Sequence, residues 1–265
     1  MPRLFNRIRK QLAKDNKFFQ YSRYAIGEIL LVVIGILIAL QINYWSEEHK
    51  DRQKGKEYMA RLSEELETDR RNMKLNLTFY QDVSKYGQMA LEYAEKGLQE
   101  GHTHWEMLLA FFQAGQIWPL QQGTSTYEEL KSAGDFVLVQ NPEIRKDLIF
   151  YYGQGALSYS QTVGINPPYR KMIRGKIPVN IQNYMWDNCH VTKGVIQYMK
   201  PCPPPISEKD AEELLRELVA DRNLLEELRF FMSNIRAGMP PVELQRELCE
   251  KILTNIKLNA GNKPG

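Results

Sequence analysis

Two short segments of this 265-residue chain contain side chains that could bind a metal ion. His102 and His104 are separated by one threonine, and Cys189 is followed directly by His190. Imidazole nitrogens and thiolates are ligands that zinc prefers. Nothing in the spacing brings the two segments together, and His102 lies in a Gly-His-Thr-His sequence typical of a solvated loop. We therefore expect no metal and no cofactor, and keep His102, His104 and His190 as the metal candidates that a structure can test.

Catalytic motifs are absent from the sequence. There is no G-x-S-x-G, no H-E-x-x-H, no phosphate-binding loop and no dinucleotide fingerprint. The carboxylates alternate with basic residues, as at Glu212, Glu213 and Arg216, which is typical of a solvated helix face. The sequence therefore predicts no catalytic residue and disfavours an enzyme.

The three cysteines have two interpretations. In an oxidising compartment, Cys189 and Cys202 would close a loop of about 13 residues, and a disulfide there would stabilise the fold by about 3 kcal/mol. Cys249 follows Leu248 on an apolar helix face, so we expect it to be buried and unpaired. Three free thiols in a cytosolic domain are the alternative, and they require the opposite membrane topology.

An apolar stretch near the N-terminus has the length of a membrane span. Residues 24–42 contain only two strongly polar side chains, and the apolar run is unbroken from position 29 to Leu40. Nineteen helical residues cover about 28 Å, close to a hydrocarbon core of about 30 Å. Tyr24 and Trp45 stand at its ends, where aromatic rings meet lipid headgroups. No small-x-small cleavage site follows, so we predict an uncleaved transmembrane anchor over 23–45 rather than a signal peptide or a buried core helix.

Two features lie within this predicted anchor. Glu28 is a carboxylate inside the span, which makes it a functional candidate, but it lies one turn from Tyr24 and could reach headgroups or Arg23. Gly35 and Ala39 form a small-xxx-small step that would allow a second helix to approach closely.

Basic residues surround the span unequally. Seven lysines and arginines precede position 24 against Asp15 alone, so residues 1–23 carry a net charge of +6 and the remainder of the chain carries −3. Four basic residues follow the span, at positions 50–56. We predict a basic amphipathic cytoplasmic segment over 1–22 that contacts anionic lipid headgroups, with 46–265 outside the cytoplasm. Nucleic acid is not an expected partner.

Beyond the span the pattern is helical. A stripe at alternating spacings of three and four predicts a helix from about Lys56 to Leu98, which can continue from the span with Gly55 as the only weak point. The stripe needs a partner, either the apolar residues after Ser207 or a second copy of the chain. Its members are Leu62, Leu66, Asp69, Met73, Leu77, Tyr80, Ser84, Gly87, Leu91, Ala94 and Leu98.

Further helix starts are marked by caps and prolines. Ser125 and Thr126 fit capping boxes, Asn141 precedes a first-turn proline, and Ser207 opens a long C-terminal helix. Pro240 and Pro241 would restart the chain for a last helix. Seven prolines between 166 and 205 predict an irregular excursion over about 164–206.

Two segments resemble a known family. The sequence KFFQYSRYAIGEILLVVIGILIALQINYWSEE (17–48) and the sequence TSTYEELKSAGDFVLVQNPEIRKDLIFYY (124–152) resemble an uncharacterised family of single-pass membrane proteins of Bacteroidetes, domain of unknown function 6090. The resemblance implies a bacterial inner membrane and a periplasmic helical domain. It implies no activity.

The sequence thus predicts an all-α protein, with a transmembrane helix followed by an elongated, bundle-like extracytoplasmic domain. A structural, scaffolding or protein-interaction role with a membrane or periplasmic protein partner is favoured, and a homo-oligomer stays open. The first alternative is a periplasmic small-ligand sensor, in which residues 150–169 and the excursion close over a ligand.

Overall fold

The structure is a computed structural model, and it describes residues 17–163, 166–194 and 196–261. The chain divides into two compact units, 1–57 and 58–265. Helix α2 (Lys17–Lys96) crosses this boundary and is continuous at Gly55. It ends at Lys96 because Gly97 adopts a positive φ of 75°, which glycine tolerates best. The predicted continuity of the span with the following helix is confirmed.

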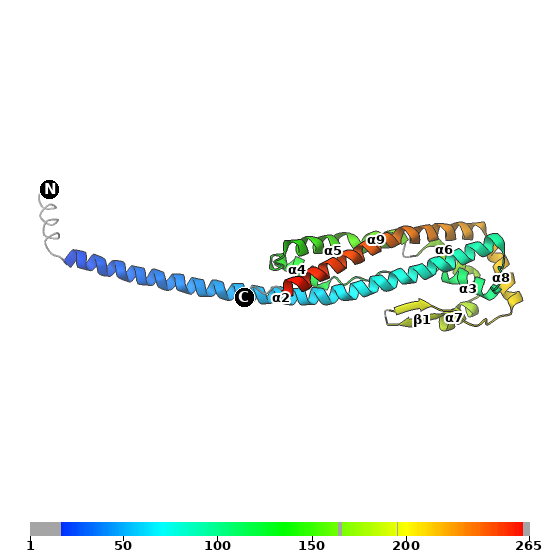
Figure 1. Cartoon of the computed structure of the whole chain (residues 1–265), viewed down its shortest axis with the longest axis horizontal. Helices are drawn as coiled ribbons and strands as arrows, with labels where there is room; N and C mark the ends of the chain where they lie inside the picture. The colour runs from blue at the N-terminus through cyan, green and yellow to red at the C-terminus, as the bar shows by residue number, and fades with distance from the viewer. Residues whose placement is uncertain (1–16, 164–165, 195, 262–265) are drawn as a thin grey trace. The chain divides into compact units, whose positions relative to one another are not determined.

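Three long helices form the frame of the second unit. The later part of α2, α5 (Pro142–Val163) and α9 (Arg222–Gly261) lie side by side in Figure 1. Helices α2 and α9 are antiparallel, since Arg229 Nη2 lies 3.8 Å from Glu95 Oε1 and Lys257 Nζ lies 3.0 Å from Glu67 Oε1.

The predicted apolar stripe is covered within the chain as far as Ala94, whereas Leu98 lies beyond the end of α2 and is 39% exposed. Leu62 and Leu66 are fully buried, and Gly87 lies so close to Met232 of α9 that a Cβ would meet its sulfur. The segment after Ser207 therefore supplies the expected partner. A second copy of the chain is not needed to cover this stripe.

The prediction of an irregular excursion over about 164–206 is wrong for much of that range. It contains α6 (Pro168–Lys176), α7 (Val179–Asn188) and a hairpin of β1 (His190–Lys193) and β2 (Ile196–Met199). Pro167 and Pro178 are the N-cap residues of the two helices, with φ of −63° and −54°. Proline is preset for this turn and has no N–H to leave unpaired, so these prolines open helices rather than prevent them.

The hairpin is the departure from an all-α fold in the described residues. Strands β1 and β2 are antiparallel, with His190 opposite Met199 and Lys193 opposite Ile196. Gly194 takes φ of 60° at the turn. Apart from this hairpin, the predicted helical class is confirmed.

The shorter helices are held by caps, some predicted and some not. Helix α3 (His104–Gln113) starts in a capping box of Thr103 and Glu106, and Ser207 caps α8 (Glu208–Ala220) as predicted. The Asn141 side chain accepts from the backbone N–H of Glu143 at 2.9 Å, also as predicted. The boxes predicted at Ser125 and Thr126 are wrong: α4 (Ser125–Ala133) has no side-chain cap of its own. A 3-10 turn, η1 (Asp135–Leu138), follows it.

The C-terminal helices break at another point than predicted. Pro240 and Pro241 lie inside α9, whereas the chain breaks at Asp221, whose carboxylate accepts from the N–H of Leu224 at 3.1 Å. Ile235 before the prolines and Val242 after them are both buried. Because α9 is packed on both sides of the prolines, the helix continues through them, although proline by itself disfavours a helix interior.

The core of the second unit is rich in aromatic rings. Trp105, Phe111 and Phe112 of α3 are buried, as are Tyr151 of α5 and Tyr169 of α6. The Tyr169 hydroxyl donates to the Phe111 carbonyl at 2.7 Å, so burial leaves this polar end satisfied. Helices α3 and α6 therefore form one packed end with α7, α8 and the hairpin (Figure 1).

Candidate functional site

The predicted membrane segment is uncovered along the first part of α2. Tyr24, Leu40 and Trp45 are 83%, 60% and 63% exposed, and Glu28 and Ala39 are exposed too. The stretch contains an 18-residue window with a mean hydropathy of 2.6 and no buried residue. By length and composition, α2 is able to cross a membrane.

The helix-pairing step in this segment is also uncovered. A Cβ placed on Gly35 would meet nothing within 4 Å. The described part of the first unit therefore offers the Gly35 and Ala39 face without any contact from the chain itself. Residues 1–16 of the predicted basic segment lie outside the described residues.

The three histidines do not converge as metal ligands. The His102 Nδ1 lies 3.2 Å from Glu106 and the His104 Nδ1 lies 3.3 Å from Glu208, both at the start of helices. His190 packs edge-on against Trp186 at 4.9 Å between ring centroids. Among residues 17–163, 166–194 and 196–261, no three His, Cys, Asp or Glu side chains gather in a metal-binding group.

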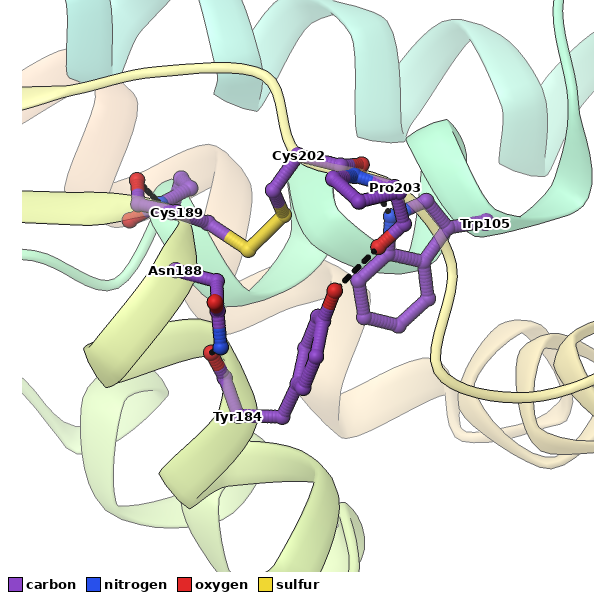
Figure 2. Close-up of a disulfide and its surroundings, with 7 residues drawn as sticks. Trp105, Tyr184, Asn188, Cys189, Cys202 and Pro203 are labelled. Atoms are coloured by element: carbon purple, nitrogen blue, oxygen red, sulfur yellow. Dashed lines mark hydrogen bonds between the residues drawn. A yellow bond between two sulfur atoms is a disulfide. The ribbon is translucent and has the colours of Figure 1, made fainter.

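A disulfide joins Cys189 and Cys202, which are 5.1 Å apart at Cα (Figure 2). The thiolate of Cys189 is therefore not available as the zinc ligand that its sequence position suggests. The Trp105 indole donates to the Cys202 carbonyl at 2.9 Å, and the Tyr184 hydroxyl donates to the Pro203 carbonyl at 2.9 Å. The bridge and these bonds fasten the segment before α8 to α3 and α7.

The most unusual buried group is the carboxylate of Asp69 on α2, which is 2% exposed. It accepts from the Gly123 N–H at 2.8 Å and from the Tyr151 hydroxyl at 2.9 Å. Burial raises the pKa of Asp69 to about 6, although these two hydrogen bonds oppose the shift. Cys249 of α9 lies in the same region, and burial raises the pKa of its thiol to about 12. This thiol donates to the Leu66 carbonyl and is not poised as a nucleophile.

Glu65, one turn before Asp69, caps α4 from outside. Its carboxylate accepts from the Thr126 hydroxyl at 2.7 Å and from the Thr126 N–H at 3.2 Å. The Ser125 hydroxyl donates to the same carboxylate. Glu65 thus replaces the local capping box, because its carboxylate satisfies the amide that a cap would satisfy. Glu65 and Asp69 together act as structural polar groups that fix α4 and its preceding loop to α2.

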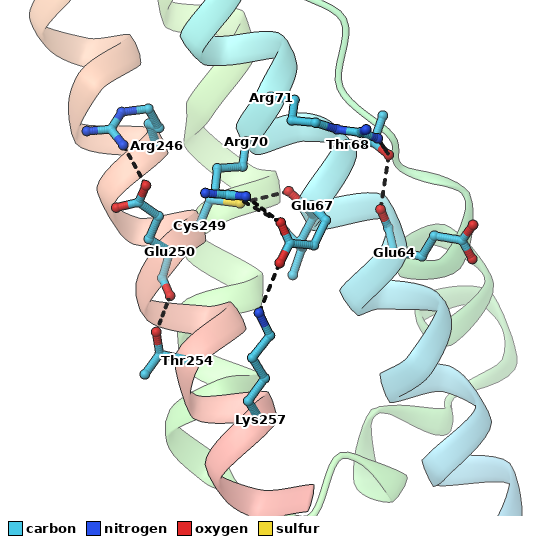
Figure 3. Close-up of polar contacts among 11 residues, drawn as sticks. Glu64, Glu67, Thr68, Arg70, Arg71, Arg246, Cys249, Glu250, Thr254 and Lys257 are labelled. Atoms are coloured by element: carbon cyan, nitrogen blue, oxygen red, sulfur yellow. Dashed lines mark hydrogen bonds and ion pairs between the residues drawn. The ribbon is translucent and has the colours of Figure 1, made fainter.

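On the surface, charged side chains join α2 to α9 (Figure 3). Glu67 accepts from Lys257 and lies 2.8 Å from Arg70, and the bond to Lys257 lowers the pKa of Glu67. Arg246 is held between Glu243 and Glu250 on α9 itself. These pairs are typical of a solvated helix surface and give no catalytic arrangement.

A small cavity lies beside Trp118. Asn72, Asn76 and Leu120 are among the residues that line it, and its volume of about 10 Å³ is enough for one water molecule. The Asn76 amide nitrogen donates to the Trp118 carbonyl at 2.7 Å, while its Oδ1 has no partner in the described structure. A cavity of this volume is far smaller than the ligand pocket that a sensor requires.

The sequence indicates one of these groups and misses others. Asp69 stands as a charged residue at a core position of the stripe, which is a signal of a buried polar site. The role of Glu65 has no local signal, since its partners lie about 60 positions away in the chain.

Comparison with family models, curated proteins and solved structures found no match to this chain.

Proposed function

We propose that this protein is a membrane-anchored helical module that acts through contacts with other proteins, as a scaffold or interaction domain. The observation that carries the proposal is helix α2, which supplies both an exposed apolar stretch of membrane length and the buried stripe of the folded unit. The resemblance of segments 17–48 and 124–152 to the Bacteroidetes family 6090 supports the same class of protein.

The placement of the folded unit outside the cytoplasm is part of this proposal. The pairing of Cys189 with Cys202 supports it, since disulfides persist in oxidising compartments such as the bacterial periplasm. The seven basic residues before position 24 support a cytoplasmic N-terminus that contacts anionic headgroups. The proposed location is thus a bacterial inner membrane, crossed once.

Contact surfaces are available on the second unit. Phe230, Leu244 and Leu258 of α9 are each 62% exposed, and Val137 of η1 is 70% exposed. The histidines that could have formed an active site are engaged in helix starts and ring contacts instead. We therefore favour a protein partner in the membrane or periplasm, with a homo-oligomer through the Gly35 face as one form of it.

Protease protection and crosslinking of the full chain in its own membrane test this proposal. In intact spheroplasts, external protease should remove residues 58–265 and leave a membrane-bound fragment. A photo-crosslinking residue at Phe230 or Leu244 should yield products of discrete mass, whereas one at the exposed Glu213 should not. Protection of the folded unit, or equal yields at all three positions, would contradict the proposal.

A small-ligand sensor is the alternative function. It requires a pocket under residues 150–169, and the side chains of 154–165 lie outside the described residues. Saturable ligand binding by the full chain, without any crosslinked partner, would favour this alternative.

A further inference from the structure

Two arginines on α6 have no acidic partner among the described residues. Arg170 Nη1 donates to the Gly115 carbonyl at 2.9 Å, and Arg174 Nη2 donates to Oε1 of Gln116 at 3.2 Å. Arg170 also lies 3.4 Å from the same Gln116 oxygen. In the part of the chain that the structure describes, no carboxylate lies within 4.0 Å of either guanidinium.

Two other cations of this unit, Lys176 and Arg246, are paired with acids. Lys176 of the same helix lies 2.8 Å from Asp221, and Arg246 is held between two glutamates. Arg170 and Arg174 differ because each is partly buried and each faces the other's charge. Burial, followed by the charge of Arg174, lowers the pKa of Arg170 to about 10, and burial lowers the pKa of Arg174. Two desolvated positive charges on adjacent turns are unfavourable without a counter-charge.

Hydrogen bonds within the chain use only some of the N–H donors of Arg170 and Arg174. The Gly115 carbonyl lies just beyond the C-terminus of α3, where a cation is favoured by the helix dipole. That bond uses Nη1 of Arg170, and a guanidinium has five donors. Arg174 donates to Gln116, and its guanidinium lies 5.1 Å from the centre of the Trp186 ring and 5.9 Å from that of Phe112.

Buried polar atoms without partners lie around the two arginines. Gln116 is 2% exposed, and its Nε2 has no partner within the described structure although its Oε1 contacts both guanidinium groups. His190 is 9% exposed, and its Nδ1 likewise has no partner there. Trp186 lies between the arginines and His190, since its ring contacts both Arg174 and His190.

We propose that Arg170, Arg174 and Gln116 form a binding site for the oxyanion group of a small ligand, a carboxylate or a phosphate. An oxyanion supplies the negative charge that this cluster lacks and accepts several N–H donors at once. Guanidinium groups match carboxylate and phosphate oxygens in two-point contacts, which an ammonium group cannot do. The rings of Trp186 and Phe112 lie beside the Arg174 guanidinium, at 5.1 Å and 5.9 Å from their centroids. The site does not depend on the proposed scaffolding role.

Anion titration of the full chain in uncharged detergent micelles tests the site. Inorganic phosphate and succinate are the two probes, and sodium chloride at matched ionic strength is the reference. We expect saturable binding of at least one probe by calorimetry, together with a higher Tm and a change in tryptophan fluorescence. A response to phosphate alone or to succinate alone assigns the ligand class. No saturable binding of either probe beyond the chloride reference would overturn the proposal.

Variants of α6 separate the site from general charge effects. Arg174→Gln should weaken binding about tenfold, because a hydrogen bond to a charged group is lost. Lys171→Gln removes the same charge from an exposed position of the same helix and should leave the affinity unchanged. Arg174→Lys keeps the charge and should give an intermediate affinity, which covers the case in which Arg174→Gln fails to fold. Equal losses of affinity in Lys171→Gln and in the Arg174 variants would show a general effect of net charge and would overturn the proposed site.

Discussion

At the scale of single residues, Asp69 shows how a buried carboxylate can be kept in a helical core. Tyr151 of α5 and the N–H of Gly123 bind its oxygens, and Glu65 and Cys249 lie nearby. The group is structural, yet it remains costly when ionised because the hydrogen bonds do not fully replace water. The contribution of Asp69 to the free energy of unfolding should therefore depend on pH.

We predict that Asp69→Asn removes a pH-dependent part of stability. The pKa of Asp69 is raised from 3.8 to about 6 in the folded state, so its contribution to stability is complete below pH 4 and is lost as the pH rises through 6. Between these two pH limits, the contribution of Asp69 to the free energy of unfolding changes by up to about 3 kcal/mol. Asparagine stays neutral and can accept from Gly123, so the variant should lose less stability than the wild type between pH 4 and pH 7.

Chemical denaturation at several pH values measures this difference. Carboxylates with lowered pKa values, such as Glu67 and Glu243, act in the opposite direction in both proteins and cancel in the comparison. Glu213→Gln, at an exposed position, is the control and should follow the wild type. Identical profiles for wild type and Asp69→Asn would contradict the prediction.

The cysteines allow a second test at this scale. In the native, unreduced protein no cysteine should react with iodoacetamide at pH 7.5, because two are bridged and the Cys249 thiol is buried with a pKa of about 12. Unfolding without reductant should expose one thiol, and unfolding with reductant should expose three. Mass spectrometry counts the adducts, and labelling of Cys189 or Cys202 in the unreduced protein would refute the disulfide.

Loss of the disulfide should destabilise the fold measurably. Cys202→Ser opens a loop with a sequence separation of 13, which corresponds to about 3 kcal/mol of unfolding free energy in the chain-entropy view. Reductant should lower the Tm of the wild type and leave the variant unchanged. A variant that still responds to reductant would point to another bridge.

At the scale of elements, close packing of α2 on α9 is decided by a glycine. A Cβ on Gly87 would collide with the Met232 sulfur, whereas a Cβ on Gly153 of α5 would meet nothing within 4 Å. Alanine favours a helix over glycine by about 1 kcal/mol at either position. The two sites therefore separate helix propensity from packing.

We predict different outcomes for the two alanine variants. Gly153→Ala should raise the unfolding free energy by about 0.5 to 1 kcal/mol, since it reduces backbone freedom without any contact. Gly87→Ala should gain less or lose stability, because Met232 must move. Urea denaturation gives both values, and equal stabilisation would show that α2 and α9 are farther apart at this point.

Particular elements show what local sequence can predict. The caps at Asn141 and Ser207 are predicted correctly because each acts within three residues of its own position. The box predicted at Ser125 is wrong because Glu65, distant in sequence, competes for the same donors. The prolines at 167 and 178 do not prevent the helices that follow, since proline fits the extended backbone of an N-cap residue, and Pro168 fits the first helical position. The arginine pair of α6 lies in the segment that this proline pattern wrongly assigns to irregular chain.

At the scale of the whole molecule, the proposed membrane attachment depends on one stretch of α2, which by length and composition is able to cross a membrane. Ile34 and Leu37 lie in its apolar run and are exposed, like their neighbours. An arginine at the centre of a span costs about 3 kcal/mol in insertion. The double variant Ile34→Arg, Leu37→Arg should therefore release the protein from membranes.

Alkaline extraction of membranes measures this release. The double variant Leu244→Arg, Leu258→Arg places the same charges on exposed apolar positions of α9 and should stay in the membrane fraction. If both double variants extract equally, the apolar run of α2 is not the anchor.

The sequence alone determined the features that depend on neighbours along the chain. The apolar run up to Leu40, the stripe through Leu62 and Leu66 and the helix starts at Asn141 and Ser207 follow from composition and spacing, because helix periodicity, capping and hydrophobicity act over a few residues. Which distant groups meet depends on how the helices pack in three dimensions. The Asp69 site, the cap by Glu65 and the cluster of Arg170 with Gln116 each join segments more than 50 residues apart, and such contacts depend on packing rather than on local pattern.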